Sequence, residues 1–309
     1  MQQSAAKVQG IEQIRELVAR LGVAANALAA LGAALDAHAT GRALEARLAP
    51  RIHEVLAALE LETLEGVTAA ELRPVLGEIR AYALSNVQLL FEESRVAGWS
   101  HRERALLEAA GEVSAGFAER LERRIAPVLG DLASRLSAAS ADFLDVGVGV
   151  GALAIEMARV WPGLRVVGID PWEPALAIAA EKVEVAGLAH RISLRRQSGE
   201  ELLDERAFDL AWLPGVFVPE AALERVVERV HAALRPGGWL LFPMLKPSSE
   251  RLPSALAALR ATLFGGVFSA PERIEELLRG AGFGEVRTLP SPATAVTALV
   301  AGQRRASST

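Results

Sequence analysis

The sequence predicts an α/β fold in which a mainly parallel sheet follows an all-helical N-terminal region. No strand pattern precedes residue 141, whereas the rest of the chain alternates between short apolar runs and helical periodicity. A strand, a glycine-rich turn and a helix also follow one another at residues 141–160. Such alternation is typical of a parallel sheet covered by helices on both faces. We therefore expect two domains, residues 1–138 and 139–309.

The N-terminal region begins with a helical pattern. Apolar residues recur at spacings of three and four over residues 11–21, which predicts a helix there. Gly22 and Gly32 leave open whether this Ala-rich region forms two short helices or one bent helix. A second helical stretch is expected over residues 42–61, with a break or kink at Pro50.

Two capping boxes are expected further along the helical region. Thr68 is followed three residues later by Glu71, and Ser100 by Glu103. In this motif the hydroxyl and the carboxylate each accept a hydrogen bond from a backbone N–H that the first helical turn leaves unpaired. Helices are then expected over residues 102–137, interrupted by glycines and a proline.

The second region is expected to contain seven strands and five helices. The strands are predicted at residues 142–146, 164–169, 191–196, 208–213, 237–244, 284–289 and 293–301. The helices are predicted at residues 150–160, 172–186, 219–234, 252–264 and 271–281. The last two strands are separated only by a Pro-Ser-Pro turn, so they are expected to pair antiparallel.

Composition narrows the classes of function. The chain has no cysteine, which excludes disulfides, thiolate metal sites and a cysteine nucleophile. The net charge of −5 and the lack of a basic stripe argue against a nucleic-acid partner. The five histidines show no metal-ligand spacing. No signal peptide and no apolar run of membrane length are recognised, so a cytoplasmic protein without a membrane partner is expected.

The strand, turn and helix at residues 141–160 carry the strongest functional signal. Asp145 ends the strand, and Gly147, Gly149 and Gly151 follow at every second position. Glycines in such a turn let the backbone approach a ligand closely and adopt positive φ. A dinucleotide fingerprint uses a similar turn. However, a carboxylate beside the turn suits the ammonium group of an amino-acid-bearing cofactor better than a pyrophosphate.

This segment resembles motif I of the class I S-adenosylmethionine (SAM) dependent methyltransferases, in which an acidic residue precedes Gly-x-Gly-x-Gly. The resemblance covers about residues 141–243 and includes the Arg-Pro-Gly-Gly turn at residues 235–238. It implies a Rossmann-like seven-stranded sheet with an antiparallel last strand, SAM as cofactor, and an N-terminal helical domain that covers the pocket.

The resemblance also implies roles for individual residues. Asp145 would bind the amino group of SAM, and Asp170, at the end of the second strand, would accept the ribose hydroxyls. Trp172 would stack on adenine. Ser198 or Glu200 would stand in for the acidic residue that the family often places beside the adenine amine. The predicted cofactor-binding residues are Asp145, Gly147, Val148, Gly149, Gly151, Asp170, Pro171, Trp172, Ser198, Gly199, Glu200, Leu213 and Pro214.

Catalysis is expected to depend mainly on proximity and orientation, because the methyl group of a sulfonium is already activated. A general base is needed only when the acceptor must lose a proton early. His101 is the best candidate for this base, because it lies in a predicted connection with Trp99 and Ser100. Tyr82 and Asn86, four residues apart on one helix, are expected to form a substrate wall. No metal is expected.

The favoured function is methyl transfer to a small molecule, such as an intermediate of natural product biosynthesis, by a homodimer that pairs through the N-terminal helices. The acceptor could be an N, O or C atom. Three alternatives remain open at this stage. They are a SAM-consuming enzyme that forms azetidine-2-carboxylate and methylthioadenosine, a nicotinamide oxidoreductase, and a non-catalytic scaffold.

Overall fold

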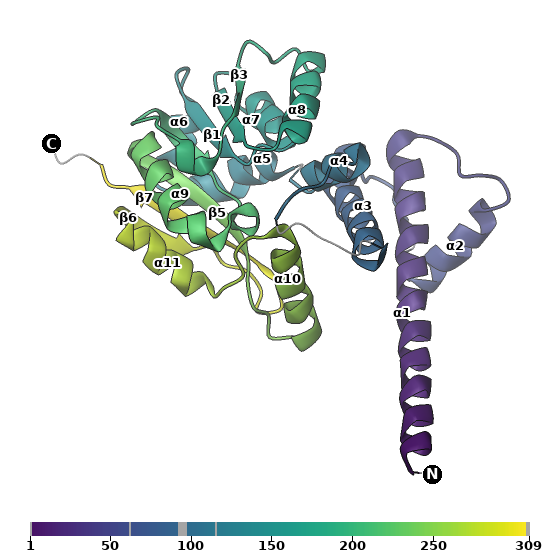
Figure 1. Ribbon diagram of the computed structural model, residues 1–309. Helices are drawn as coiled ribbons and strands as arrows, with labels where there is room; N and C mark the ends of the chain where they lie inside the picture. The colour runs from purple at the N-terminus through teal and green to yellow at the C-terminus, as the bar shows by residue number, and fades with distance from the viewer. Residues whose placement is uncertain (1, 62, 92–97, 115, 307–309) are drawn as a thin grey trace. The chain divides into compact units, whose positions relative to one another are not determined.

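The computed structural model describes residues 2–61, 63–91, 98–114 and 116–306. The chain divides into two compact units, Met1–Leu90 and Phe91–Thr309 (Figure 1). The first unit contains α1 (Gln2–Thr40), α2 (Ala49–Ala58) and most of α3 (Ala69–Phe91). The helices after residue 103 group with the sheet, whereas the functional boundary expected at residues 138/139 stays a prediction.

Gly22 and Gly32 do not interrupt α1, which runs as one helix from Gln2 to Thr40. A Cβ on Gly32 would lie 3.1 Å from Cγ2 of Ile79, so this glycine lets α1 and α3 approach closely. Nearby, Leu35 of α1 and Leu72 and Leu76 of α3 form the small core of the first unit. Gly32 therefore affects helix packing, whereas a Cβ on Gly22 would meet nothing within 4 Å, and neither glycine interrupts the helix.

The capping box at Thr68 and Glu71 is confirmed. The backbone N–H of Glu71 donates to the Thr68 hydroxyl over 3.3 Å, and the N–H of Thr68 donates to the Glu71 carboxylate over 2.9 Å. The second box is wrong, because α4 begins at Arg104 and Glu103 occupies its N-cap position. Part of the connection before Ser100, residues 92–97, lies outside the described residues.

Two helical expectations need correction. The stretch expected over residues 42–61 is helical only as α2, which begins at Ala49 and ends at Ala58. Pro50 lies in the first turn of α2, where its missing N–H costs nothing, rather than at a kink inside a longer helix. The expected helices over residues 102–137 are short. They are α4 (Arg104–Glu112), α5 (Phe117–Arg120), a π-turn η1 (Leu121–Ile125), a 3₁₀ turn η2 (Ala126–Val128) and α6 (Leu132–Leu136). Gly116, with φ +76°, separates α4 from α5.

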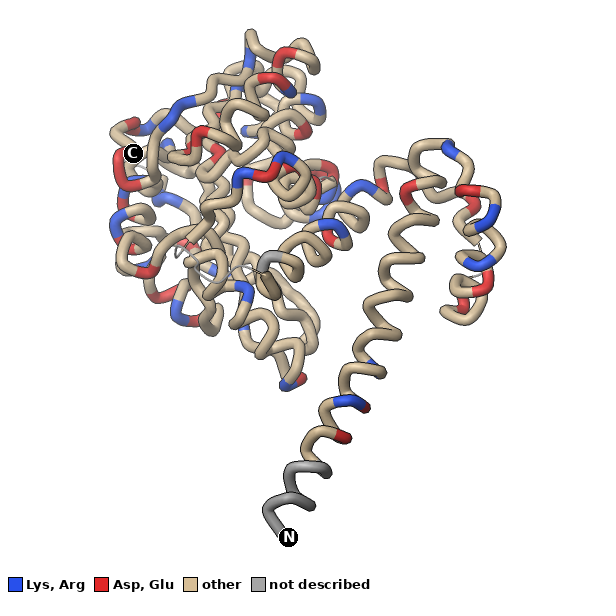
Figure 2. Tube along the Cα trace, turned by 45° about the vertical axis from the view of Figure 1, so that its right-hand side comes forward, with Lys and Arg blue, Asp and Glu red and all other residues tan. Residues whose placement is uncertain are grey.

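The expectation that no apolar run approaches membrane length is also wrong. By length and composition, residues Gly10–Thr40 of α1 are sufficient to cross a membrane. Residues 21–40 are mostly Ala and Leu, and Asp36 is the only Asp, Glu, Lys or Arg among them. The tube along α1 is accordingly mostly uncharged (Figure 2). However, Leu35 is buried against α3, and Asp36 forms ion pairs with Arg42 and Arg80. The second half of this helix therefore packs and forms ion pairs within the first unit.

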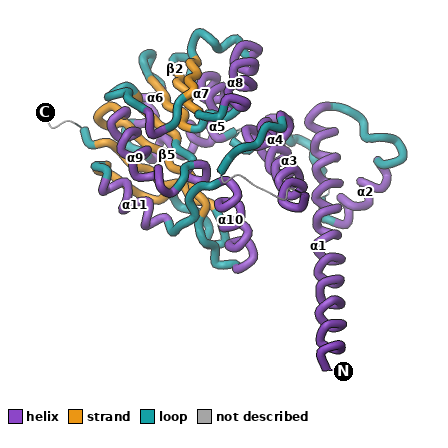
Figure 3. The backbone as a smooth tube through the Cα atoms, in the orientation of Figure 1, coloured by secondary structure: helices purple, strands orange, loops and turns teal. Residues whose placement is uncertain are grey.

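The sheet of the second unit has seven strands (Figure 3). They are β1 (Asp142–Val146), β2 (Arg165–Asp170), β3 (Ile192–Arg196), β4 (Phe208–Trp212), β5 (Leu234–Leu245), β6 (Phe283–Thr288) and β7 (Thr297–Arg304), in the order β3-β2-β1-β4-β5-β7-β6. The first five strands are parallel, and β7 pairs antiparallel with both β5 and β6. The predicted fold class is therefore confirmed.

Helices cover both faces of the sheet (Figure 1). The short helices α5 and α6 pack on one face with α7 (Ala152–Val160) and part of α8 (Glu173–Val185), around Phe143, Leu210 and Trp239. On the other face, α9 (Glu220–Ala233) and α11 (Pro271–Gly280) pack around Leu144 and Phe242. The remaining helix, α10 (Arg251–Phe264), follows β5. Short 3₁₀ turns η3 (Gly199–Glu201) and η4 (Gly215–Phe217) follow β3 and β4.

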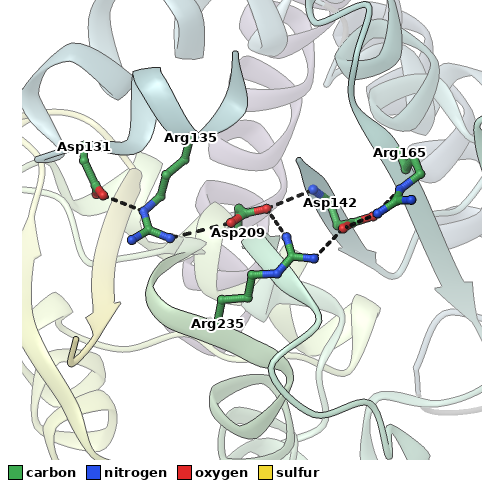
Figure 4. A network of polar contacts seen from close by, with 6 residues as sticks. All are labelled: Asp131, Arg135, Asp142, Arg165, Asp209 and Arg235. Atoms are coloured by element: carbon green, nitrogen blue, oxygen red, sulfur yellow. Dashed lines mark hydrogen bonds and ion pairs between the residues drawn. The ribbon is translucent and has the colours of Figure 1, made fainter. Parts of the chain in front are cut away.

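A network of charged side chains joins the amino ends of the central strands (Figure 4). Its six members are Asp131, Arg135, Asp142, Arg165, Asp209 and Arg235. Arg235 bridges Asp142 and Asp209, and the N–H of Asp142 donates to Asp209 over 3.0 Å. Burial raises the pKa of Asp142, but hydrogen bonds from Arg165 and Arg235 outweigh it, so the pKa is lowered overall. This network links β1, β4 and β5 at the amino ends of the strands, on the side of the sheet opposite to the strands' carboxyl ends.

The strand order reverses between β1 and β4. The chain goes outward from β1 through β2 to β3, and then returns to the other side of β1 to form β4. In open α/β sheets, ligands bind beyond the carboxyl ends of the strands at this reversal. The glycine turn follows β1, and η4 follows β4, so both lie beyond the carboxyl ends of these strands.

Candidate active site

The glycine turn between β1 and α7 is held close to β2. All three glycines have positive φ, with values of 75° at Gly147, 54° at Gly149 and 75° at Gly151. The N–H groups of Gly147 and Val148 donate to the Ile169 carbonyl oxygen over 2.8 and 3.0 Å. A side chain would strain each glycine, because L residues rarely adopt this backbone conformation. The turn therefore adopts the positive φ that was predicted from its sequence, and its close approach to a cofactor stays a prediction.

Asp170 fixes this turn from the end of β2. Its Oδ2 accepts the N–H of Gly149 over 2.9 Å, and its Oδ1 accepts the N–H of Trp172 over 2.8 Å. The side chain is buried, and burial raises its pKa although both hydrogen bonds act in the opposite direction. Asp170 therefore ties the glycine turn to the start of α8. Each carboxylate oxygen retains a second lone pair for a ligand.

Asp145 is a buried carboxylate with an unsatisfied oxygen. The residue is only 1% exposed, and its Oδ2 has no hydrogen-bond partner. Burial, followed by the nearby charge of Asp170, raises the pKa of Asp145 to about 7. An unpartnered buried carboxylate is costly. A positively charged donor supplied by a ligand would remove this cost, so the residue fits the ammonium end of the expected cofactor.

The segment after β3 differs in part from the prediction. Ser198 and Glu201 form a capping box at the start of η3, and the N–H of Ser198 donates to the Glu201 carboxylate over 2.9 Å. Glu200 forms an ion pair with Arg225 of α9 at 2.8 Å. Both candidates for the adenine position therefore already have protein partners. Their role in adenine binding, and that of Gly199, stays a prediction.

The residues after β4 lie beside the glycine turn. The N–H of Leu213 donates to the Leu241 carbonyl oxygen over 3.0 Å, which continues the pairing of β4 with β5. A Cβ on Gly147 would lie 3.8 Å from Cγ of Pro214. The structure thus brings Pro214, the glycine turn and Asp170 to one edge of the sheet, as predicted. Pro171, which joins Asp170 to Trp172, lies at the same edge.

A short segment, Gly98–Arg102, extends along this edge, and we call it the strap. The indole N–H of Trp172 donates to the carbonyl oxygen of His101 over 2.6 Å, and the Arg102 guanidinium lies 5.1 Å from the centre of the Trp172 ring. Trp172 therefore contacts the protein through both its ring and its N–H. Sequence reasoning missed this link, since no local pattern connects residues 71 positions apart.

The catalytic candidates belong to different units. His101 is partly buried in the second unit, and its ring meets that of Trp99 edge to face at 4.6 Å. Tyr82 and Asn86 lie on α3 of the first unit, where the Tyr82 hydroxyl donates to Glu78 over 2.5 Å. The catalytic roles of these three residues stay predictions. Within the described residues, no group of three His, Asp or Glu side chains could hold a metal ion.

Comparisons with known proteins agree with this site. The family described as "Methyltransferase domain" matches residues 143–238, from β1 to the start of β5. Nocamycin O-methyltransferase from Saccharothrix syringae is 34% identical over 173 residues, which are 48% of this chain and 61% of the relative. The match therefore spans less than two thirds of that relative.

Two further matches cover more of the compared protein. Demethylmenaquinone methyltransferase from Thermus thermophilus is 30% identical over 161 residues, which are 45% of this chain and 73% of the relative. The crystal structure of human N-acetylserotonin methyltransferase in complex with SAM has a TM-score of 0.58 and 16% identity, with 97% of this chain and 98% of that chain covered. The seven-stranded sheet, the site at the carboxyl ends of β1 and β2, and these relatives together show that the chain belongs to the class I SAM-dependent methyltransferases.

Proposed function

We propose that this protein transfers the methyl group of SAM to a hydroxyl oxygen of a small molecule. The observation that carries the cofactor site is the unpartnered Oδ2 of buried Asp145, beside a glycine turn held by Asp170. The 34% identity to nocamycin O-methyltransferase favours an oxygen acceptor. The net charge of −5 disfavours a nucleic-acid acceptor.

In this proposal the residues in and around the glycine turn have defined tasks. The Asp145 carboxylate accepts hydrogen bonds from the ammonium group of SAM. Asp170 accepts hydrogen bonds from the ribose hydroxyls and also holds the glycine turn in place. Val148 and the three turn glycines present backbone rather than side chains. The bound cofactor supplies a methyl group already activated by a sulfonium. The protein therefore contributes mainly orientation and the exclusion of water.

The direct test is calorimetric titration of the protein with SAM and with S-adenosylhomocysteine, followed by incubation with hydroxylated small molecules. We expect micromolar binding of both ligands, release of S-adenosylhomocysteine, and a 14-dalton gain in one acceptor. Release of methylthioadenosine would instead indicate the cyclisation alternative. Failure of both ligands to bind at millimolar concentration would refute the proposal and favour a scaffold.

His101 is proposed as the base that takes the proton from the acceptor hydroxyl. It lies on the strap, and its backbone carbonyl is hydrogen-bonded to the indole of Trp172, two residues after Asp170. Replacing His101 by Gln should lower kcat about 100-fold, because a positioned base contributes at least this factor. The affinity for SAM should be unchanged. The residual rate should rise with pH, because ionisation of the acceptor itself then replaces the base.

Steady-state rates of S-adenosylhomocysteine formation from pH 6 to 10, at saturating SAM, measure this effect. Ser100→Ala, a change at an exposed neighbour on the same strap, is the matched control and should keep the wild-type rate. An unchanged kcat in His101→Gln would mean that the acceptor is methylated without a base from this residue.

We also propose a homodimer that pairs through α1. Five large apolar residues on its first half are about half exposed or more: Ile11, Ile14, Leu17, Val18 and Leu21. They recur at spacings of three and four, and Glu12, Arg15, Glu16 and Arg20 lie between them. An amphipathic stripe of this kind suits another protein helix better than a lipid environment. A second copy of the chain would supply the same stripe.

A double substitution, Val18→Glu with Leu21→Glu, should convert the dimer to a monomer, because it places charges in the buried seam. Light scattering after size-exclusion chromatography should give twice the chain mass for the wild type and the single chain mass for the variant. SAM binding should be retained. Glu12→Gln with Glu16→Gln, on the polar side of the helix, is the control. A monomeric wild type, or flotation with phosphatidylcholine vesicles, would contradict this proposal.

A further inference from the structure

An aromatic cluster lies outside the buried core of the second unit. The chain has only 9 Phe, 5 Trp and 1 Tyr. Even so, the Trp99 ring meets three other rings edge to face: those of His101 at 4.6 Å, Phe217 at 5.1 Å and Phe264 at 5.0 Å. None of these four belongs to the fully buried core, and Phe217 is 37% exposed. Trp99 also packs against the small core cluster that includes Leu107 and Ile178. Core packing does not explain why the rings of Phe217 and Phe264 gather around it.

Backbone contacts hold this cluster together. A Cβ on Gly265 would lie 2.6 Å from Cα of Gly98, and one on Gly266 would lie 1.9 Å from the Val216 carbonyl oxygen. The N–H of Val267 also donates to the Gly215 carbonyl oxygen over 2.9 Å. The strap, η4 and the end of α10 thus meet backbone to backbone. The rings of Trp99, Phe217 and Phe264 are therefore preorganised by glycines that tolerate no side chain.

The cluster adjoins the cofactor site on two sides. The backbone carbonyl oxygen of His101 accepts a hydrogen bond from the indole N–H of Trp172, two residues after Asp170. Phe217 ends the η4 turn that begins after Pro214, and Pro214 lies against Gly147 of the glycine turn. The aromatic rings therefore stand at the carboxyl end of β4. An acceptor bound there would be next to the residues that hold the cofactor.

We propose that Trp99, His101, Phe217 and Phe264 form the acceptor subsite, and that it selects planar aromatic molecules carrying a hydroxyl group. This inference rests on the proposed function. The Phe217 and Phe264 rings are nearly parallel, at 23° and 5.4 Å, with Trp99 nearly perpendicular to both. A planar ring can stack on the exposed face of Phe217, with the imidazole of His101 in the same cluster.

A saturated acceptor of the same size would lose most of this preference. Aromatic pairs contribute about 0.5–1.5 kcal/mol beyond the burial of apolar area, which corresponds to a factor of about 2 to 12 in affinity. We therefore expect the subsite to bind 2-naphthol about tenfold more tightly than the saturated analogue trans-2-decalol. The two alcohols match in size and in hydroxyl position, so the difference between their affinities measures the contribution of ring stacking.

The experiment is titration of the protein, saturated with S-adenosylhomocysteine, with each of these two alcohols. Phe217→Leu, which removes the exposed ring but keeps apolar volume, should lower the affinity for 2-naphthol about fivefold. Quenching of tryptophan fluorescence by 2-naphthol should be reduced in Trp99→Phe. Phe283→Leu is the matched control, because Phe283 is a buried ring at the amino end of β6, at the opposite sheet edge, and it should bind as the wild type does.

The outcomes separate this inference from the proposed function. Binding of S-adenosylhomocysteine together with equal affinities for the two alcohols would overturn the aromatic subsite and leave the methyltransferase site intact. The aromatic subsite would also be overturned if Phe217→Leu binds 2-naphthol as tightly as the wild type and 2-naphthol quenches the tryptophan fluorescence of Trp99→Phe as strongly as that of the wild type. Failure of S-adenosylhomocysteine to bind the wild type would overturn both.

Discussion

Replacement of Asp170 by alanine is expected to weaken SAM binding at least 100-fold. The change removes the proposed acceptor for the ribose hydroxyls. It also leaves the N–H groups of Gly149 and Trp172 without their acceptor, and a buried N–H left unsatisfied costs about 1–3 kcal/mol. The glycine turn and the start of α8 would then lose their common anchor. The loss of affinity therefore has both a direct and a structural origin.

Two measurements distinguish these origins. Calorimetry gives the affinity for SAM, and amide hydrogen exchange without cofactor reports whether Gly149 and Trp172 become exposed. Asp170→Asn keeps one carbonyl acceptor, so it should bind SAM more tightly than the alanine variant but less tightly than the wild type. Glu173→Ala is the matched control, because this nearby carboxylate is exposed and pairs only with Arg196 at 3.2 Å. An unchanged affinity in Asp170→Ala would exclude Asp170 from the cofactor site.

The parts of the fold that were predictable depend on local patterns. Apolar runs and turn residues located all seven strands. Asp145 and Asp170 were singled out because they lie at the carboxyl ends of two strands, and the glycine turn because it follows the first of them. Strand limits were less accurate where turn residues take part in pairing. The segment Arg235–Gly238 lies within β5, and β7 begins at Thr297 rather than near residue 293. Hydrogen bonding between strands extends or shortens an element beyond its own sequence signal.

Tertiary contacts account for what the sequence did not reveal. The glycines at 98, 265 and 266 carry no local sign that three segments meet there. The pairing of Glu200 with Arg225 of α9 had no sign in the sequence either. The strap is joined to the start of α8 through the contacts of Trp172 with His101 and Arg102. These contacts link residues far apart in the chain, so periodicity and spacing contain no information about them.

Replacement of Asp145 by asparagine is expected to stabilise the free protein while it weakens SAM binding. The pKa of Asp145 is raised from 3.8 to about 7, so the folded state holds a proton that the unfolded chain has lost between these values. The free energy of unfolding therefore falls as pH rises through this window, and the full cost is present above about pH 7. Three pKa units correspond to about 4 kcal/mol, an upper limit for the stability gained by the variant at pH 8.

The same proton controls cofactor binding. The ammonium group of SAM favours the charged carboxylate, so binding below about pH 7 must displace the proton from Asp145. The dissociation constant of the wild type should therefore rise by up to about tenfold per pH unit as pH falls below 7. The asparagine variant has no such proton, so its affinity for SAM should be lower at pH 8 and nearly independent of pH.

Thermal unfolding and calorimetry at pH 5 and pH 8 test this prediction, with Asp209→Asn as the matched control. Asp209 is also buried on a central strand, but its carboxylate is bridged by Arg235 and accepts the N–H of Asp142 (Figure 4). Removing its charge takes one of two carboxylate partners from Arg235, which keeps Asp142, and weakens the acceptor of the Asp142 N–H, so this variant should be destabilised. Two buried aspartates on adjacent strands thus have opposite expected responses. Asp209, whose carboxylate is satisfied, supports the fold, whereas the unsatisfied Asp145 destabilises it until the cofactor binds.

A lower stability of Asp145→Asn than of the wild type at pH 8 would show that the Asp145 carboxylate is satisfied within the protein. It would also remove the reason for assigning this residue to the cofactor.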